Sequence, residues 1–65
     1  MIVADNAKRI IEEKGLKQSF VATRACYHVK TFNAMLNGRK VIKDIDVLRI
    51  ANALEVTPNE LFGMK

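Results

Sequence analysis

The segment from Lys14 to Lys43 contains no aspartate or glutamate, although the chain of 65 residues has seven acidic residues in all. The same segment carries seven basic residues, Lys14, Lys17, Arg24, Lys30, Arg39, Lys40 and Lys43. The acidic residues lie in the two flanks, so the net charge of +4 is concentrated in the middle of the chain. A segment of one sign creates a local positive potential that attracts polyanions. Nucleic acid is therefore the first partner that we consider.

Cysteine, histidine and long apolar runs are scarce. The single cysteine, Cys26, cannot form an intramolecular disulfide, and together with the single histidine, His28, it is too few for a structural zinc site. No apolar run approaches the ~18 residues that span a membrane, and the first residues lack the basic and apolar regions of a signal peptide. We expect one cytoplasmic domain over residues 1–65, without a cofactor, a metal or a membrane partner, that buries roughly 60% of its unfolded-chain surface.

Apolar residues recur at helical spacing along almost the whole chain, and no strand-like alternation is seen. The pattern predicts an all-α fold of five helices. They are expected over residues 3–14, 18–25 and 29–37, from Asp44 through Leu54, and after Thr57. Gly15 and Gly38 follow the first and third of these helices, where a helix C-cap glycine belongs.

Residues that can begin a helix stand before three of the predicted helices. His28 is placed to cap the third helix, and Asp44 is a suitable N-cap for the fourth. Thr57-Pro58-Asn59-Glu60 combines a capping box with proline at the first helical position. That pattern predicts a last short helix, which would carry Leu61 and Phe62.

The second and third predicted helices are joined by only Cys26-Tyr27-His28, inside the acid-free segment. Two short helices joined in this way are typical of a helix-turn-helix, which sets its second helix into the major groove of DNA. If Phe32 and Met35 point into the core, the opposite face of the third helix carries Lys30, Asn33, Ala34 and Asn37, flanked by Val29 and Thr31. Asparagine can pair with adenine, lysine can donate to guanine, and a methyl group can contact thymine.

The sequence resembles the Cro/repressor-type helix-turn-helix family, also called the XRE family, and in particular the lambda-repressor-like domain. The matching residues are Leu16-Lys17-Gln18, Val21-Ala22, Phe32, Met35-Leu36-Asn37-Gly38, Val47, Ile50-Ala51, Leu54 and Val56-Thr57-Pro58-Asn59-Glu60-Leu61-Phe62. The resemblance implies that Gln18 contacts phosphate and that Ala22 lets the two helices approach closely. It also implies that Asn37-Gly38 meets the DNA backbone. Members of the family are DNA-binding regulators, commonly dimers on two-fold symmetric operators.

Three residues depart from the family pattern. Cys26 stands where the turn usually has a glycine with positive φ, and a non-glycine residue there costs of order 1 kcal/mol. His28 and Lys17 stand at helix caps that more often hold serine or threonine. We expect these changes to affect stability more than function. Cys26 is expected to be a small, partly buried side chain, and Tyr27 is expected to pack at the turn.

We therefore expect a sequence-specific transcriptional regulator of the phage or mobile-element repressor type, which represses by occupying an operator in double-stranded DNA. The residues expected to contact DNA are Gln18, His28, Val29, Lys30, Thr31, Asn33, Ala34, Asn37, Arg39, Lys40 and Lys43. A homodimer is expected, since one short helix-turn-helix reads only a few base pairs. Its interface is expected at Leu61, Phe62 and Met64, because the short helix there cannot bury every face. The alternative is a protein-interaction module, such as an antitoxin or a modulator of another regulator. An enzyme is not expected, because no activated nucleophile, phosphate loop or metal cluster is present.

Overall fold

The computed structural model of the chain describes residues 1–64 and consists of five α-helices, with no strand in that range. The helices are α1 (Ile2–Glu13), α2 (Gln18–Arg24), α3 (Val29–Leu36), α4 (Asp44–Leu54) and α5 (Pro58–Leu61). The prediction of an all-α fold with five helices is confirmed, and each predicted helix end lies within one residue of the observed one.

Glycines end α1 and α3 as predicted. Gly15 follows the C-cap of α1 with φ +66°, and Gly38 follows the C-cap of α3 with φ +77°. After α1, the Gly15 N–H donates to the carbonyl of Glu12 at 3.1 Å, and the Leu16 N–H donates to the carbonyl of Ile11 at 3.0 Å. These two bonds satisfy carbonyl groups that the helix itself leaves without partners.

The starts of α4 and α5 differ in how they are capped. Lys43, and not Asp44 as predicted, is the N-cap residue of α4. The reason is that Asp46, three residues further on, accepts a hydrogen bond from the Lys43 backbone N–H at 2.9 Å and so fixes the start one residue earlier.

The capping box predicted for α5 is confirmed. The Thr57 hydroxyl accepts a bond from the Glu60 N–H at 3.3 Å, and the Glu60 carboxylate accepts one from the Thr57 N–H at 2.9 Å. Pro58 is the first helical residue, as predicted. We had expected this helix to include Phe62, but Phe62 is its C-cap, so α5 is only one turn long.

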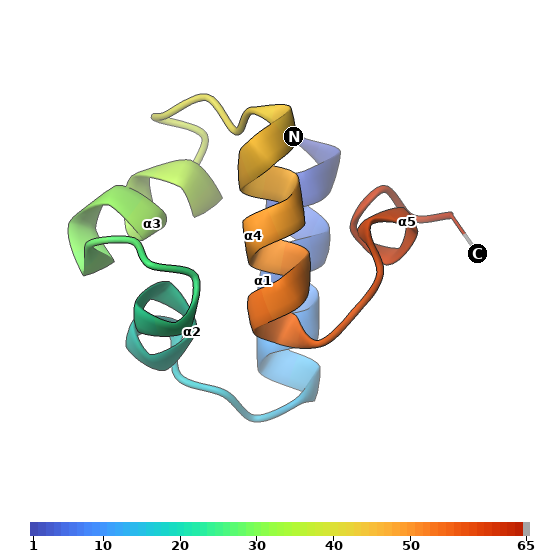
Figure 1. Cartoon of the computed structure of the whole chain (residues 1–65), viewed down its shortest axis with the longest axis horizontal. Helices are drawn as coiled ribbons and strands as arrows, with labels where there is room; N and C mark the ends of the chain where they lie inside the picture. Colours follow the sequence, from blue (N-terminus) through green and yellow to red (C-terminus); the bar gives the residue numbers. More distant parts are fainter. Residues whose placement is uncertain (65) are drawn as a thin grey trace.

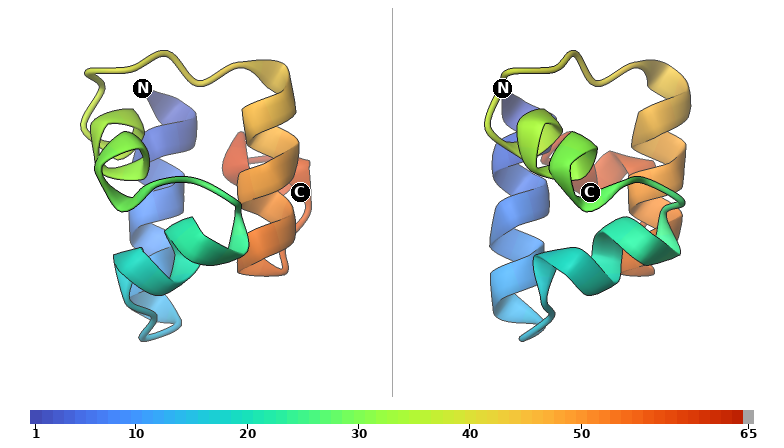
Figure 2. Two further views of the ribbon diagram at one scale, coloured as in Figure 1. Left: turned by 60° about the vertical axis from the view of Figure 1, so that its left-hand side comes forward. Right: turned by 90° about the vertical axis from the view of Figure 1, so that its left-hand side faces the viewer.

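The two longest helices, α1 and α4, pack against each other at the centre of the molecule (Figure 1). α2 and α3 cover one side of this pair, and α5 covers the other side (Figure 1, Figure 2). Every helix contributes to one apolar core. Its largest fully buried side chains are Phe32, Met35, Ile50, Leu54, Leu61, Val3 and Val21. The core therefore holds α2 and α3 in place as a pair, with the outer face of α3 left open.

The core also corrects one prediction about the partner surface. Leu61 has no exposed area and belongs to the core, so its side chain is not available to a second subunit. A one-turn helix has to bury its only large apolar side chain to be stable, and Leu61 fills that role. Phe62 and Met64, the other two residues of the expected interface, are exposed.

Candidate nucleic-acid interface

A tight turn at Cys26 sets the angle between α2 and α3. Cys26 has φ +65°, and its N–H donates to the carbonyl of Thr23 at 3.1 Å. The next residue, Tyr27, donates its N–H to the carbonyl of Ala22 at 2.8 Å. Cys26 thus takes the left-handed conformation that glycine takes at this place in the family that the sequence resembles. Its side chain is exposed, and not partly buried as expected, because a residue at the apex of a tight turn has few neighbours.

Tyr27 packs at the turn and connects it to α4. Its ring stacks on Phe32 with ring centroids 6.1 Å apart, and its hydroxyl donates to the carboxylate of Asp46. The guanidinium of Arg49 lies 5.4 Å from the centre of the Tyr27 ring, within the range of a cation–π contact. Tyr27 therefore holds the start of α3 against two side chains of α4.

This contact changes the acidity of both partners. Burial, followed by the hydrogen bond to Asp46, raises the pKa of Tyr27 to about 12. The same hydrogen bond holds the pKa of the Asp46 carboxyl below its usual range. A bond that favours protonated tyrosine and ionised aspartate is fully formed near neutral pH. Sequence reasoning did not link Tyr27 to Asp46, since no helical spacing connects residues that lie in different elements.

The structure places all the residues expected to contact DNA at the surface. His28, Val29, Lys30, Asn37, Arg39, Lys40 and Lys43 are exposed, and Gln18, Thr31, Asn33 and Ala34 are half-buried. On the other face of α3, Phe32, Met35 and Leu36 are buried. The division of α3 into an inward and an outward face, which was inferred from helical periodicity, is therefore confirmed.

The outward face of α3 is connected to the loop that follows the helix. The Ala34 carbonyl accepts bonds from the backbone N–H groups of Arg39 at 2.9 Å and Lys40 at 3.2 Å, which turns the chain back along α3. The Arg39 guanidinium then donates to the side-chain oxygen of Asn33 at 3.0 Å. A shallow hollow forms there, and its lining residues are Val29, Lys30, Asn33, Ala34 and Arg39. Sequence reasoning missed this link because Arg39 lies beyond the end of the helix.

Most cations of the acid-free segment remain without an acidic partner among residues 1–64. Arg24 is paired with Glu55 at 3.8 Å, and the Lys14 ammonium donates to the Leu54 carbonyl at 2.9 Å, where it caps the end of α4. The other five cations form no ion pair in that range. They are Lys17, Lys30, Arg39, Lys40 and Lys43, all exposed. Their charge lies on α3 and on the loops beside α2 and α3.

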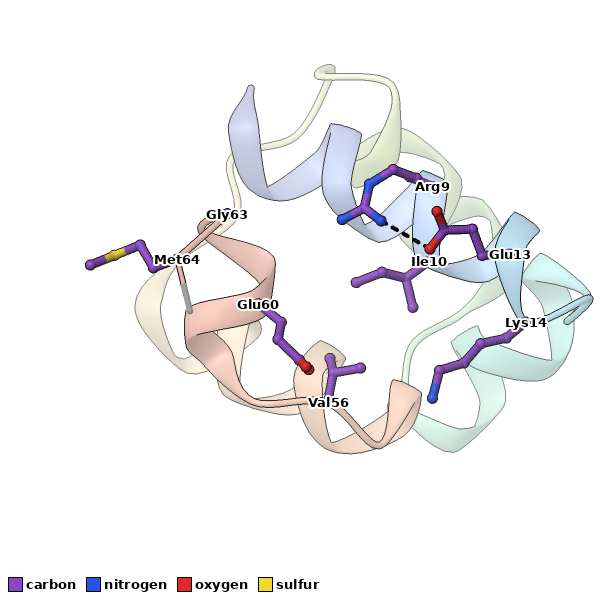
Figure 3. Close-up of a pocket in the computed structure, with 8 residues that line it drawn as sticks. All are labelled: Arg9, Ile10, Glu13, Lys14, Val56, Glu60, Gly63 and Met64. Carbon is purple, nitrogen blue, oxygen red and sulfur yellow. Dashed lines mark hydrogen bonds and ion pairs between the residues drawn. The ribbon is translucent and has the colours of Figure 1, made fainter.

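A second hollow lies between α1 and α5, on the far side of α1 from this surface, and has a different character (Figure 3). Arg9 and Glu13 are paired within it at 2.9 Å, and Glu60 adds a further carboxylate (Figure 3). Its charge is mixed, so it lacks the single sign that attracts a polyanion. The outward face of α3 is thus the better candidate for binding nucleic acid.

Two further features of residues 1–64 bear on function. No helix in this part of the chain is long and apolar enough to cross a membrane. No group of three histidine, cysteine, aspartate or glutamate side chains is placed to hold a metal ion, within the same residues.

Comparison with known proteins identifies one family. A family model described as a helix-turn-helix domain matches residues 5–61, which include α2, the turn and α3. No curated protein and no solved structure matches the chain significantly.

Proposed function

We propose that this chain, which belongs to the helix-turn-helix domain family of the XRE/Cro kind, is a sequence-specific DNA-binding transcriptional regulator. The single observation that carries the proposal is the outward face of α3. It is held by the Cys26 turn and is free of carboxylates. The five cations that form no ion pair within residues 1–64 lie on it or on the loops beside α2 and α3. A surface of this kind suits the major groove, where side chains reach base edges and cations approach phosphates.

The proposed roles follow from position. Lys30, Asn33 and Ala34 lie in the middle of the outward face of α3 and read base edges, with Val29 and Thr31 beside them. The remaining residues lie at helix ends or in the loop after α3 and contact phosphates. These are Gln18, His28, Asn37, Arg39, Lys40 and Lys43. His28 is available for this role because its side chain makes no capping hydrogen bond.

The protein would act as a homodimer on a two-fold symmetric operator, with recognition helices about 34 Å apart. One domain, residues 1–65, would form each half. Phe62 and Met64, which follow α5 in the sequence and are 48% and 61% exposed, are the proposed contacts between subunits. Exposed apolar side chains that lie together can form a contact between proteins.

Occupation of the operator would exclude polymerase, so we propose repression of the phage or mobile-element type. The proposed action on DNA also places the protein in the cytoplasm of the host cell. Both statements rest on the family and on the positive surface around α3.

A protein-interaction module remains the alternative. The observation that favours it is a set of exposed apolar side chains outside the DNA-facing residues, namely Val41, Ile45 and Leu48. An antitoxin or a modulator of another regulator would use such residues to bind a different protein. It would not need to exclude acids from residues 14–43.

Selection of bound duplexes from a random DNA pool tests the proposal. A regulator of this kind would enrich one sequence, and a dimer would enrich an inverted repeat of it. Enrichment of no sequence, together with capture of a protein partner, would favour the interaction module instead.

A further inference from the structure

The side chain of Asn33, in the middle of the outward face of α3, is hydrogen-bonded to two neighbouring side chains. Its side-chain oxygen, Oδ1, accepts two hydrogen bonds, from Asn37 Nδ2 at 3.0 Å and from Arg39 Nη2 at 3.0 Å. An amide oxygen has two lone pairs, so both acceptor positions of Asn33 are occupied. Its Nδ2 group makes no side-chain hydrogen bond within residues 1–64.

Arg39 determines which end of the Asn33 amide faces outward. Oxygen and nitrogen of an asparagine side chain are distinguished by their hydrogen-bond partners, and an arginine guanidinium can only donate. The atom of Asn33 next to Arg39 must therefore be the oxygen. Asn37 alone would not decide this, because its own amide could turn to accept instead of donate. Arg39 thus leaves the donor group of Asn33 available.

The hollow on α3 consequently offers hydrogen-bond donors and no free side-chain acceptor. Lys30, one turn before Asn33, adds an ammonium group, and Val29 and Ala34 supply apolar atoms. In the major groove guanine presents two acceptors, N7 and O6, whereas adenine presents one acceptor and one donor. Adenine would need the side-chain oxygen of Asn33, and that oxygen is occupied. Cytosine presents a donor, and thymine presents only one acceptor.

We propose that Asn33 reads guanine, with its amide held in the donating orientation by Arg39, and that Lys30 donates to the same base pair or its neighbour. This inference rests on the proposed function and specifies its ligand. It replaces the pairing of asparagine with adenine that the residue type alone suggests. Arg39 is a positioning residue, since it acts on the base through Asn33. Its charge also contributes to the proposed phosphate contact.

The experiment begins with duplexes selected by the unaltered full chain. The position at which Asn33→Ala changes the base preference of the protein is identified. Affinities are then measured with guanine and with adenine at that position. The variants Arg39→Met, Lys40→Met and the double variant Asn33→Ala/Arg39→Met are measured on the same duplexes. Lys40→Met is the matched control. It removes one cation from the same loop, but Lys40, unlike Arg39, does not donate a side-chain hydrogen bond to Asn33. Circular dichroism confirms that each variant is folded.

The unaltered chain should prefer guanine to adenine by about tenfold or more, as expected for a good base contact. Arg39→Met frees one lone pair of the Asn33 oxygen, so the preference should fall to nearly equal binding of guanine and adenine. Lys40→Met should weaken binding to both duplexes alike and keep the preference. In the Asn33→Ala background, Arg39→Met should leave the ratio unchanged, because the residue through which it acts is absent.

The inference is overturned if the base at the Asn33-dependent position is adenine, or if Arg39→Met and Lys40→Met have the same effect on the ratio. Either result leaves the proposed function intact, because a specific site has been found. Failure to select any sequence contradicts the proposed function and the inference with it.

Discussion

Cys26 holds a backbone conformation that is unfavourable for any residue with a Cβ atom. Its φ of +65° falls in the left-handed region, where non-glycine residues lose roughly 1–2 kcal/mol. We expect Cys26→Gly to increase the free energy of unfolding by about 0.5–1 kcal/mol, since part of the gain is offset by the greater entropy of an unfolded glycine. Urea unfolding monitored by circular dichroism measures the change.

Gly15 provides the matched control at the same φ. A Cβ atom at Gly15, with φ +66°, would meet no atom within 4 Å, so any effect of Gly15→Ala comes from the backbone alone. Gly15→Ala should therefore destabilise the protein by about 1 kcal/mol. If Cys26→Gly also destabilised the protein, the result would contradict a left-handed backbone conformation at Cys26 in the folded protein.

Variants of Asn33 and Lys43 distinguish a residue that reads a base from one that contacts phosphate. Asn33→Ala should cost about 1–3 kcal/mol on the selected site and relax the preference at one base position. Lys43→Ala removes an exposed cation, so it should weaken binding to selected and scrambled duplexes alike and reduce the salt slope by about one. An unchanged ratio of the two affinities in Asn33→Ala would show that α3 is not the reading helix.

At the scale of elements, the position of α3 relative to α4 depends on the contact between Tyr27 and Asp46 of α4. Tyr27 is the only tyrosine of the chain, so the ultraviolet absorbance of tyrosinate reports its ionisation directly. We expect a midpoint near pH 12. Asp46→Asn should lower that midpoint, because the carboxylate contributes to the raised pKa. A midpoint near the ordinary value of about 10 in the unaltered chain would contradict the contact.

The same contact makes stability depend on pH in two ranges. The pKa of Tyr27 is raised in the folded state, so its contribution is complete below about pH 10 and is lost as pH rises through about 12. The pKa of Asp46 is lowered, so its contribution is present above about pH 4 and is lost as pH falls below that value. Tyr27→Phe keeps the ring that stacks on Phe32 and removes the hydroxyl. The dependence of unfolding on pH should be flatter in this variant at both ends.

Helix positions followed from the sequence because each depends on local chemistry. The capping box from Thr57 to Glu60 and the glycines after α1 and α3 act over three or four residues, and their effects were predicted correctly. The start of α4 was misplaced by one residue because Asp44 and Asp46 are both acceptable near a helix start. Only the hydrogen bond to Lys43 distinguishes them.

The candidate site was predicted as a set of surface residues but not as a set of contacts. Helical periodicity identifies the outward face of α3, since it needs only the spacing of Phe32 and Met35. It could not show that Arg39 holds Asn33 or that Tyr27 holds α4, because both contacts join separate elements. Leu61 was assigned to a partner for a similar reason, since sequence alone does not show which apolar residues of a short helix the core takes up.

Assembly of two subunits is the prediction that belongs to the whole molecule. Phe62→Ala combined with Met64→Ala should shift the protein toward monomers and weaken binding to an inverted repeat, because both residues are exposed at the proposed interface. Phe20→Ala is the control. Phe20 has the same exposed fraction as Phe62, 48%, but lies on α2. Sedimentation that showed monomers both free and on saturated DNA, for the unaltered chain, would contradict the dimer.

The positive charge around α3 gives the whole molecule its proposed attraction to DNA, and the salt dependence of binding tests it most directly. The affinity of the unaltered chain for its selected duplex is measured over a range of salt concentrations. If about three or four of the unpaired cations neutralise phosphates in each subunit, log affinity should fall against log salt with a slope of about −0.9 for each phosphate contact. A flat response would contradict DNA binding through this surface.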